Sequence, residues 1–264
     1  MLREKFKELH NKESFFILGN CWDVPSAKIY ENLGFQALGT SSWALSSING
    51  VLDGENVRFT TVLKNAEIIL KHINIPLSID IEKGYSTNVD EIVENVIALA
   101  NIGCAGINIE DSSITGTLLP IHKFADILEK IKTRLLHDGF NNFVINARTD
   151  TYLLNSCTNK YEETVARENA YQNAGADCLF VPGLYELSEI TNISYDTSLP
   201  LNILNLPGMA NVNDLKKAGV NRFSLGNSVF DDMLAYLERT TKNTLSNGNF
   251  SKHYDHDELN IKFT

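Results

Sequence analysis

The chain has 264 residues, of which 43% are hydrophobic and 21% are charged, a composition typical of a soluble globular protein with a full core. Its net charge of −10 argues against nucleic-acid binding as a principal role, because affinity for phosphate comes from clustered Lys and Arg. No apolar run approaches the roughly 20 residues of a membrane-spanning helix. The N-terminal segment also lacks the apolar stretch of a signal peptide, so we expect a cytoplasmic protein without a membrane partner.

Short runs typical of β-strands alternate with helical patterns along almost the whole chain. Strands are predicted at 15–20, 35–42, 76–82, 105–111, 143–149, 178–184, 200–206 and 222–227, with intervening helices that include 90–101, 124–136, 161–174 and 212–218. This alternation predicts an α/β fold with a parallel sheet, and eight such units predict a closed (β/α)8 TIM-type barrel, for which about 250 residues are typical. We therefore expect a single barrel domain over residues 1–264.

Residues 230–264 follow the last predicted strand as a tail. Its first half carries apolar side chains at helical spacing, at Met233, Leu234, Leu237 and Leu245. An apolar helix face needs a surface to cover. We expect the tail to pack outside the barrel or on a partner subunit.

Three predicted strands carry polar residues where a barrel core is normally apolar. The residues are the pairs Asp80 and Glu82, Asn108 and Glu110, and Asn146 and Arg148. Side chains alternate between the faces of a strand, so each pair is predicted to share one face. Carboxylates directed into one space repel each other by roughly a few kcal/mol per pair at an effective dielectric of about 20. A hard divalent metal with an anionic substrate would balance this charge.

Polar residues also follow other predicted strands, at the end where barrel enzymes carry their chemistry. The backbone N–H groups of Thr40, Ser41 and Ser42 could converge on an oxyanion, although ordinary turn formation explains such a sequence better. Asp53 lies in a turn-like sequence. Any one carboxylate could instead cap a helix or pair with an Arg. Their joint occurrence favours a site.

Other chemistries lack their residues. No Lys falls inside a predicted strand, which argues against a Schiff-base aldolase. The chain has no nucleophile elbow, no phosphate-binding loop and no dinucleotide fingerprint. Its four Cys form no CxxC pair, which disfavours zinc.

The elements D-I-E-K-G-Y at 80–85, N-I-E-D at 108–111 and N-A-R-T-D at 146–150 occur in this order. With further elements, they resemble the isocitrate lyase and phosphoenolpyruvate mutase superfamily over most of the chain. The further elements lie at 19–23, 34–35, 40–42, 53–54, 174–183 and 225–226. The resemblance implies an α/β barrel whose C-terminal helix is exchanged between subunits, in a homodimer or homotetramer.

The resemblance also implies roles for individual residues. The metal residues would be Asp80, as the direct ligand of Mg²⁺ (or Mn²⁺), and Glu82 and Glu110, which would hold the ion largely through water. The catalytic residues would be Asp53, as a further acidic partner, and Arg148, which would bind the substrate carboxylate. Thr40, Ser41 and Ser42 would grip the oxyanion end of the substrate, and Asn202 would contact it as well.

The loop at 112–120, S-S-I-T-G-T-L-L-P, departs from the superfamily pattern. It lacks the K-[KR]-C-G-H motif of lyases that cleave isocitrate or methylisocitrate, and the Lys and Asn of phosphonate-forming mutases. Members similar to oxaloacetate decarboxylase need less from this loop, because loss of carbon dioxide leaves an enolate that water can protonate. We therefore expect a magnesium-dependent lyase that cleaves a C–C bond of a small 2-oxo or 2-hydroxy dicarboxylic acid through a pyruvate-type enolate.

Two alternatives stay open at this point. The first is an enzyme acting on a C–P bond, similar to phosphoenolpyruvate mutase, carboxyphosphonoenolpyruvate mutase or phosphonopyruvate hydrolase. The second is a non-catalytic protein that binds a 2-oxo acid. The composition of the 112–120 loop separates C–C from C–P chemistry only weakly, and its lack of acid-base residues is what keeps the binding protein open.

Overall fold

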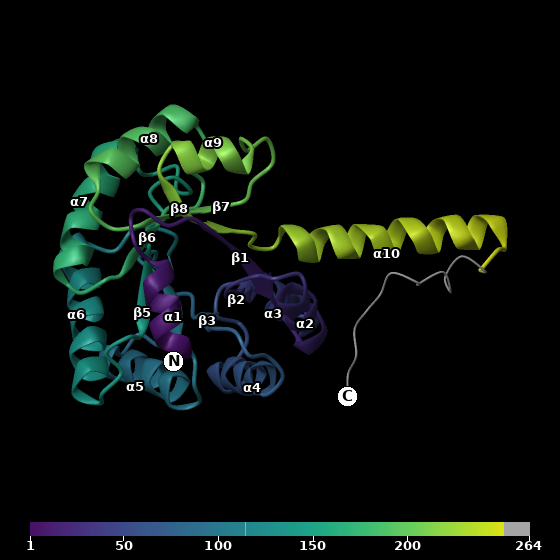
Figure 1. The fold of residues 1–264 in the computed structure, drawn as a ribbon, viewed down its shortest axis with the longest axis horizontal. Helices are drawn as coiled ribbons and strands as arrows, with labels where there is room; N and C mark the ends of the chain where they lie inside the picture. The colour runs from purple at the N-terminus through teal and green to yellow at the C-terminus, as the bar shows by residue number, and fades with distance from the viewer. Residues whose placement is uncertain (114, 251–264) are drawn as a thin grey trace.

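The computed structural model describes residues 1–113 and 115–250, in which eight parallel strands form a closed barrel with helices around it (Figure 1). The strands are β1 (Phe16–Cys21), β2 (Leu38–Thr40), β3 (Leu77–Asp80), β4 (Gly106–Glu110), β5 (Val144–Arg148), β6 (Cys178–Phe180), β7 (Leu201–Leu204) and β8 (Val220–Ser224). The helices are α1 (Leu2–Leu9), α2 (Val24–Asn32), α3 (Ser42–Ile48), α4 (Phe59–Leu70), α5 (Val89–Asn101), α6 (Ile121–His137), α7 (Lys160–Asn173), α8 (Leu187–Asp196), α9 (Val212–Lys217) and α10 (Ser228–Asn247). The predicted barrel, its eight strands and the four predicted helices are confirmed.

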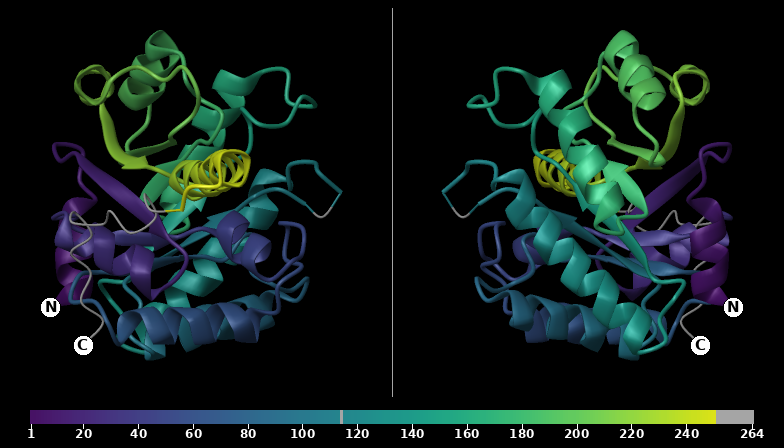
Figure 2. Two further views of the ribbon diagram at one scale, coloured as in Figure 1. Left: turned by 90° about the vertical axis from the view of Figure 1, so that its right-hand side faces the viewer. Right: turned by 90° about the vertical axis from the view of Figure 1, so that its left-hand side faces the viewer.

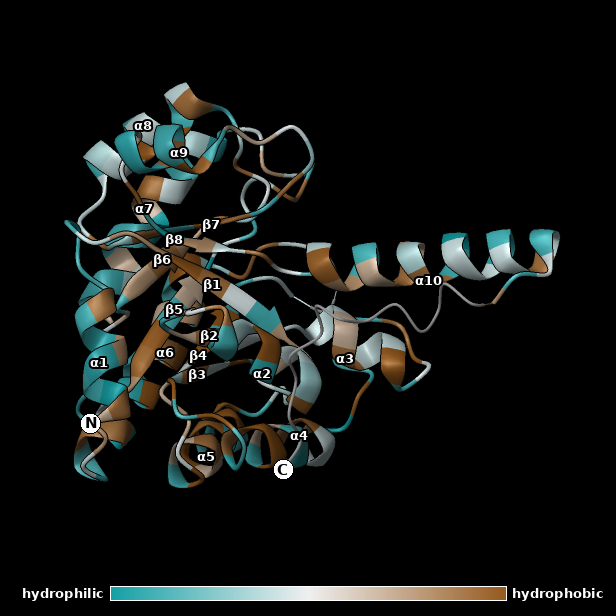
Figure 3. Ribbon diagram, turned by 45° about the vertical axis from the view of Figure 1, so that its right-hand side comes forward, coloured by the Kyte–Doolittle hydropathy of each residue, from teal (hydrophilic) through white to brown (hydrophobic). Residues whose placement is uncertain are grey.

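Strand β8 closes the barrel by pairing in parallel with β1, where Ile17 lies opposite Phe223. Alternation along the strands divides apolar from polar side chains. Ile107 and Ile109 are fully buried in the main apolar core, whereas Asn108 between them lines a pocket inside the barrel. Figure 3 shows hydrophobic residues gathered on the strands and on α4 and α5. The interior is therefore unusually polar for a barrel of this kind, where bulky branched residues usually fill the space.

Helix α1 packs against the amino ends of the strands. Phe6 is fully buried in an apolar cluster with Leu18 and Val144. His10, which follows the helix, is also buried, and its ring packs edge-on against Phe16 at a centroid distance of 5.2 Å. The opposite end of the barrel carries the carboxyl ends of the strands.

Helix α10 extends away from the barrel instead of packing along it (Figures 1 and 2). Its apolar side chains are accordingly exposed: Tyr236 and Leu237 are each 61% exposed, and Met233 is 44% exposed. The predicted helical tail is therefore present, but residues 251–264 of that prediction lie outside the described part of the chain. No helix in the described part is long and apolar enough to cross a membrane.

Candidate active site

A pocket of about 170 Å³ opens at the carboxyl ends of the strands. It is lined by Asn20, Gly39, Thr40, Ser41, Ser42, Trp43, Asp53, Ser78, Asp80, Asn108, Arg148, Phe180, Leu204, Arg222, Ser224, Gly226 and Asn227. The structure therefore brings six of the predicted site residues together. They are Thr40, Ser41, Ser42, Asp53, Asp80 and Arg148.

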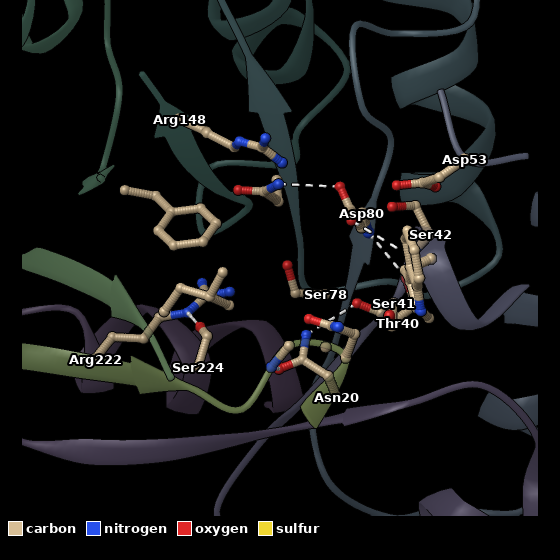
Figure 4. A pocket seen from close by; sticks show the side chains of 17 residues that line it. Asn20, Thr40, Ser41, Ser42, Asp53, Ser78, Asp80, Arg148, Arg222 and Ser224 are labelled. Atoms are coloured by element: carbon tan, nitrogen blue, oxygen red, sulfur yellow. Dashed lines mark hydrogen bonds between the residues drawn. The ribbon is translucent and has the colours of Figure 1, made fainter. Parts of the chain in front are cut away.

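Asp80 ends β3 and is hydrogen-bonded to two neighbouring side chains (Figure 4). Its Oδ1 accepts a hydrogen bond of 3.0 Å from Asn108 Nδ2, and Asn108 Oδ1 in turn accepts one of 3.0 Å from Asn146. Its backbone N–H donates to Thr40 Oγ1 at 2.9 Å. The chain of amides fixes the carboxylate in one orientation, as a metal ligand requires.

The loop at 40–42 forms the start of helix α3. Ser41 caps that helix, since its hydroxyl accepts a hydrogen bond of 3.3 Å from the N–H of Ala44. The N–H of Ser42 is directed at Asp80 Oδ2, 3.4 Å away. One backbone donor of the predicted oxyanion loop therefore faces the pocket beside the predicted metal ligand.

Glu82 does not line the pocket, contrary to the expectation that it shares a face with Asp80. Strand β3 ends at Asp80, and Glu82 has a φ of 49°, so strand alternation no longer applies. Its buried carboxylate accepts hydrogen bonds from the N–H of Glu55 at 2.7 Å and the hydroxyl of Tyr85 at 2.9 Å. Burial, together with the charges of Asp80 and Asp53, raises the pKa of Glu82 to about 8.

Arg148 ends β5 and contacts two carboxylates. Its Nη1 lies 2.7 Å from Glu110 Oε2, and its Nε lies 2.6 Å from Asp150 Oδ1. Burial alone would lower the pKa of Arg148, but Glu110 and Asp150 outweigh it and raise the pKa. Glu110 also lies 3.5 Å from Lys83, so its charge is balanced by two cations. Glu110 does not line the pocket.

Asn202 is fully buried and does not line the pocket. Its Oδ1 accepts a hydrogen bond of 2.9 Å from Ser224, which does line it. The predicted substrate contact of Asn202 is therefore at most indirect in this structure.

Several pocket residues were not singled out from the sequence. Arg222 and Ser224 share one face of β8, and Ser78 precedes Asp80 by two residues on β3. Polar residues two apart within an apolar strand were the available signal, the same one that indicated Asn108 and Glu110.

The donor set fits a hard divalent cation held largely by water. Oxygen ligands dominate, as Mg²⁺ prefers, and this ion usually keeps several waters and takes one or two carboxylates. Within residues 1–113 and 115–250, no three His, Cys, Asp or Glu side chains form a group that could hold a metal by themselves. Asp80 as a single direct ligand, with Asp53 on the same side of the pocket (Figure 4), agrees with this geometry.

Comparison with known proteins places the chain among related sequences. The family model described as phosphoenolpyruvate phosphomutase matches residues 6–245. An uncharacterized Mycobacterium tuberculosis protein is 38% identical over 225 residues, which covers 84% of this chain and 81% of that protein. The oxaloacetate decarboxylase of Paraburkholderia xenovorans is 25% identical over 247 residues, covering 89% of this chain and 79% of the relative.

Solved structures share the fold. A phosphonopyruvate hydrolase in complex with oxalate and Mg²⁺ superposes with a TM-score of 0.84 at 20% identity, covering 96% of this chain and 89% of that one. At this identity the likeness shows the barrel architecture.

Proposed function

Because the chain belongs to the phosphoenolpyruvate phosphomutase family, we propose that it is a magnesium-dependent lyase of a small 2-oxo or 2-hydroxy dicarboxylic acid. The observation that carries the proposal is Asp80, which is oriented by Asn108 inside a pocket that also holds a backbone N–H and two guanidinium groups. This arrangement suits a metal and an anionic substrate. The oxaloacetate decarboxylase relative and the oxalate bound to the phosphonopyruvate hydrolase support a carboxylate substrate.

The metal would be held by Asp80 directly and by Glu82 and Glu110 through water, with Mn²⁺ as a substitute for Mg²⁺. When bound, it would supply Lewis-acid stabilisation of the negative charge that develops on the 2-oxo oxygen as the C–C bond breaks. Asp53 would act as the further acidic partner at the rim of the pocket.

Arg148 would bind the substrate carboxylate. A guanidinium has five N–H donors, and only three of the five in Arg148 are engaged by Glu110 and Asp150. Two donors stay available for a planar anion. Thr40, Ser41 and Ser42 would hold the oxyanion end beside Asp80, towards which the Ser42 N–H is directed in this structure. Asn202 would act through Ser224.

A substrate screen tests this proposal. Wild-type protein with Mg²⁺ is incubated with 2-oxo and 2-hydroxy di- and tricarboxylates and with phosphonopyruvate, and pyruvate or oxaloacetate release is measured. We expect release of pyruvate from one of the di- or tricarboxylates, and loss of this activity when EDTA removes the metal. Turnover of phosphonopyruvate alone would instead identify an enzyme of C–P bonds, and no turnover of any compound would favour a binding protein.

We also propose that α10 packs on a neighbouring subunit, in a homodimer or homotetramer. Its exposed apolar residues Met233, Leu234 and Leu237 have no barrel surface to cover within the described chain. A second copy would provide that surface.

A further inference from the structure

The two guanidinium groups of the pocket differ in their charge partners. Arg148 is paired with Glu110 and Asp150. Arg222 has no carboxylate within ion-pair distance among the described residues, although it is only 3% exposed. Burial accordingly lowers the pKa of Arg222 to about 10, which still leaves it charged at neutral pH. The unpaired positive charge of this pocket therefore belongs to Arg222.

The neighbours of Arg222 accept few of its hydrogen bonds. Its Nε donates to Ser224 Oγ at 3.3 Å, and its Nη1 lies 3.3 Å from His10 Nε2. His10 Nδ1 lies 2.7 Å from the carbonyl of Phe6, which can only accept, so Nδ1 carries the proton and Nε2 is the acceptor for Arg222. Of the five N–H donors of the guanidinium, three have no partner in the described part of the chain.

Other unpartnered polar atoms lie near Arg222. The hydroxyl of Ser78, which is 1% exposed and lines the pocket, has no hydrogen-bond partner among the described residues. Nδ2 of the buried Asn202, whose Oδ1 accepts from Ser224, also has no partner among the described residues, but Asn202 itself does not line the pocket. In Figure 4, Ser78 lies between Arg222 on one side and Asp80 on the other. Buried donors without acceptors cost free energy unless a ligand satisfies them, so this half of the pocket is suited to an anion.

We propose that Arg222 recognises the second carboxylate of the substrate, with the unpartnered hydroxyl of Ser78 as a supporting donor and Ser224 as the group that orients the guanidinium. This inference rests on the proposed function, which assigns the first carboxylate to Arg148 and the 2-oxo oxygen to the metal. A pocket with one metal-binding half and one unpaired guanidinium selects dicarboxylates over monocarboxylates. Arg222 is then a specificity-determining residue, and its planar donors suit a carboxylate better than the ammonium of Lys would.

Malate and lactate provide a matched pair of probes, because both are 2-hydroxy acids and only malate has a second carboxylate. Calorimetric titration in Mg²⁺ is done with both enantiomers of each acid, on wild-type protein and on Arg222→Gln. We expect wild-type protein to bind malate about tenfold or more tightly than lactate, as a charge-assisted hydrogen-bonded pair predicts. In Arg222→Gln that preference should fall below about threefold through loss of malate affinity alone. Arg148→Lys is the control, since it should weaken both ligands to a similar degree.

Three results would overturn the inference. If wild-type protein binds both acids and Arg222→Gln keeps the malate preference, Arg222 has no role in specificity while the proposed function stands. If Arg222→Gln weakens lactate and malate equally, Arg222 is only a structural support. If wild-type protein binds neither acid with Mg²⁺, the proposed function fails as well. Should Arg222→Gln not fold, Arg222→Lys decides, because it keeps the charge and should still lose malate affinity selectively.

Discussion

His10 should make the stability of this protein depend on pH in a predictable direction. Burial first, and then the positive charge of Arg222, lower the pKa of His10 from its ordinary value of 6.5 to about 3. In the unfolded chain the ring protonates as the pH falls through about 6.5, whereas in the fold it stays neutral until about pH 3. The unfolded state therefore binds more protons in this range, and the contribution of His10 to stability is lost as the pH falls from about 6.5 toward 3.

The magnitude follows from the width of this pH window. Each pH unit is worth about 1.4 kcal/mol, so at pH 5 the fold should be destabilised through His10 by about 2 kcal/mol relative to pH 7. The variant His10→Asn removes the titration and retains a donor for the carbonyl of Phe6. The other titratable groups of the variant titrate as in wild type, so their contributions to the pH dependence cancel in the difference between the two proteins.

Urea unfolding of both proteins at pH 7 and pH 5 measures this effect. The free energy of unfolding of wild-type protein should exceed that of His10→Asn at pH 7, and the difference should shrink by about 2 kcal/mol at pH 5. A difference that is unchanged or larger at pH 5 would refute the argument, because His10 would then be charged in the fold.

Three further predictions concern the site and the assembly. Asp80→Ala should lose Mg²⁺ affinity in calorimetry and keep or raise its melting temperature without metal, because one carboxylate leaves a like-charged group; retained affinity would remove Asp80 as the metal ligand. Arg148→Lys keeps the charge but not the paired donors, so kcat/KM on the best substrate of the screen should fall by a factor that corresponds to about 2–5 kcal/mol of lost transition-state binding. A change below about threefold would show that Arg148 only balances its carboxylate neighbours. Light scattering should give a dimer or tetramer for wild-type protein at micromolar concentration, and a smaller mass for Leu234→Glu/Leu237→Glu; a wild-type monomer would contradict the proposed role of α10.

The barrel could be predicted because its signal is local and repeated. Each strand is a short apolar run, and the chemistry follows directly at its end, as it does at Asp80 and Arg148. Thr40, Ser41 and Ser42 were found for the same reason. Eight such units in order leave a closed parallel barrel as the expected solution.

Other features depended on information that the strand pattern does not carry. The expectation that Glu82 shares a strand face with Asp80 was wrong, because the chain leaves the strand immediately after Asp80 and adopts a positive φ at Glu82. The spacing of Arg222 and Ser224 on β8 indicated a shared polar face but not which side of the strand that face lies on. Only closure of β8 against β1 places Arg222 inside the barrel, and only the full set of contacts shows that it lacks a carboxylate partner.

The proposed function requires this pocket to stabilise an enolate of the pyruvate type. Proton NMR of pyruvate in deuterium oxide tests it without knowledge of the physiological substrate, because an enolising site exchanges the methyl protons of pyruvate for deuterium. We predict Mg²⁺-dependent loss of the methyl signal with wild-type protein, and loss at no more than the protein-free rate with Asp80→Ala. A methyl signal that persists with wild-type protein and Mg²⁺ would contradict the claim and leave a pocket that binds oxo acids without activating them.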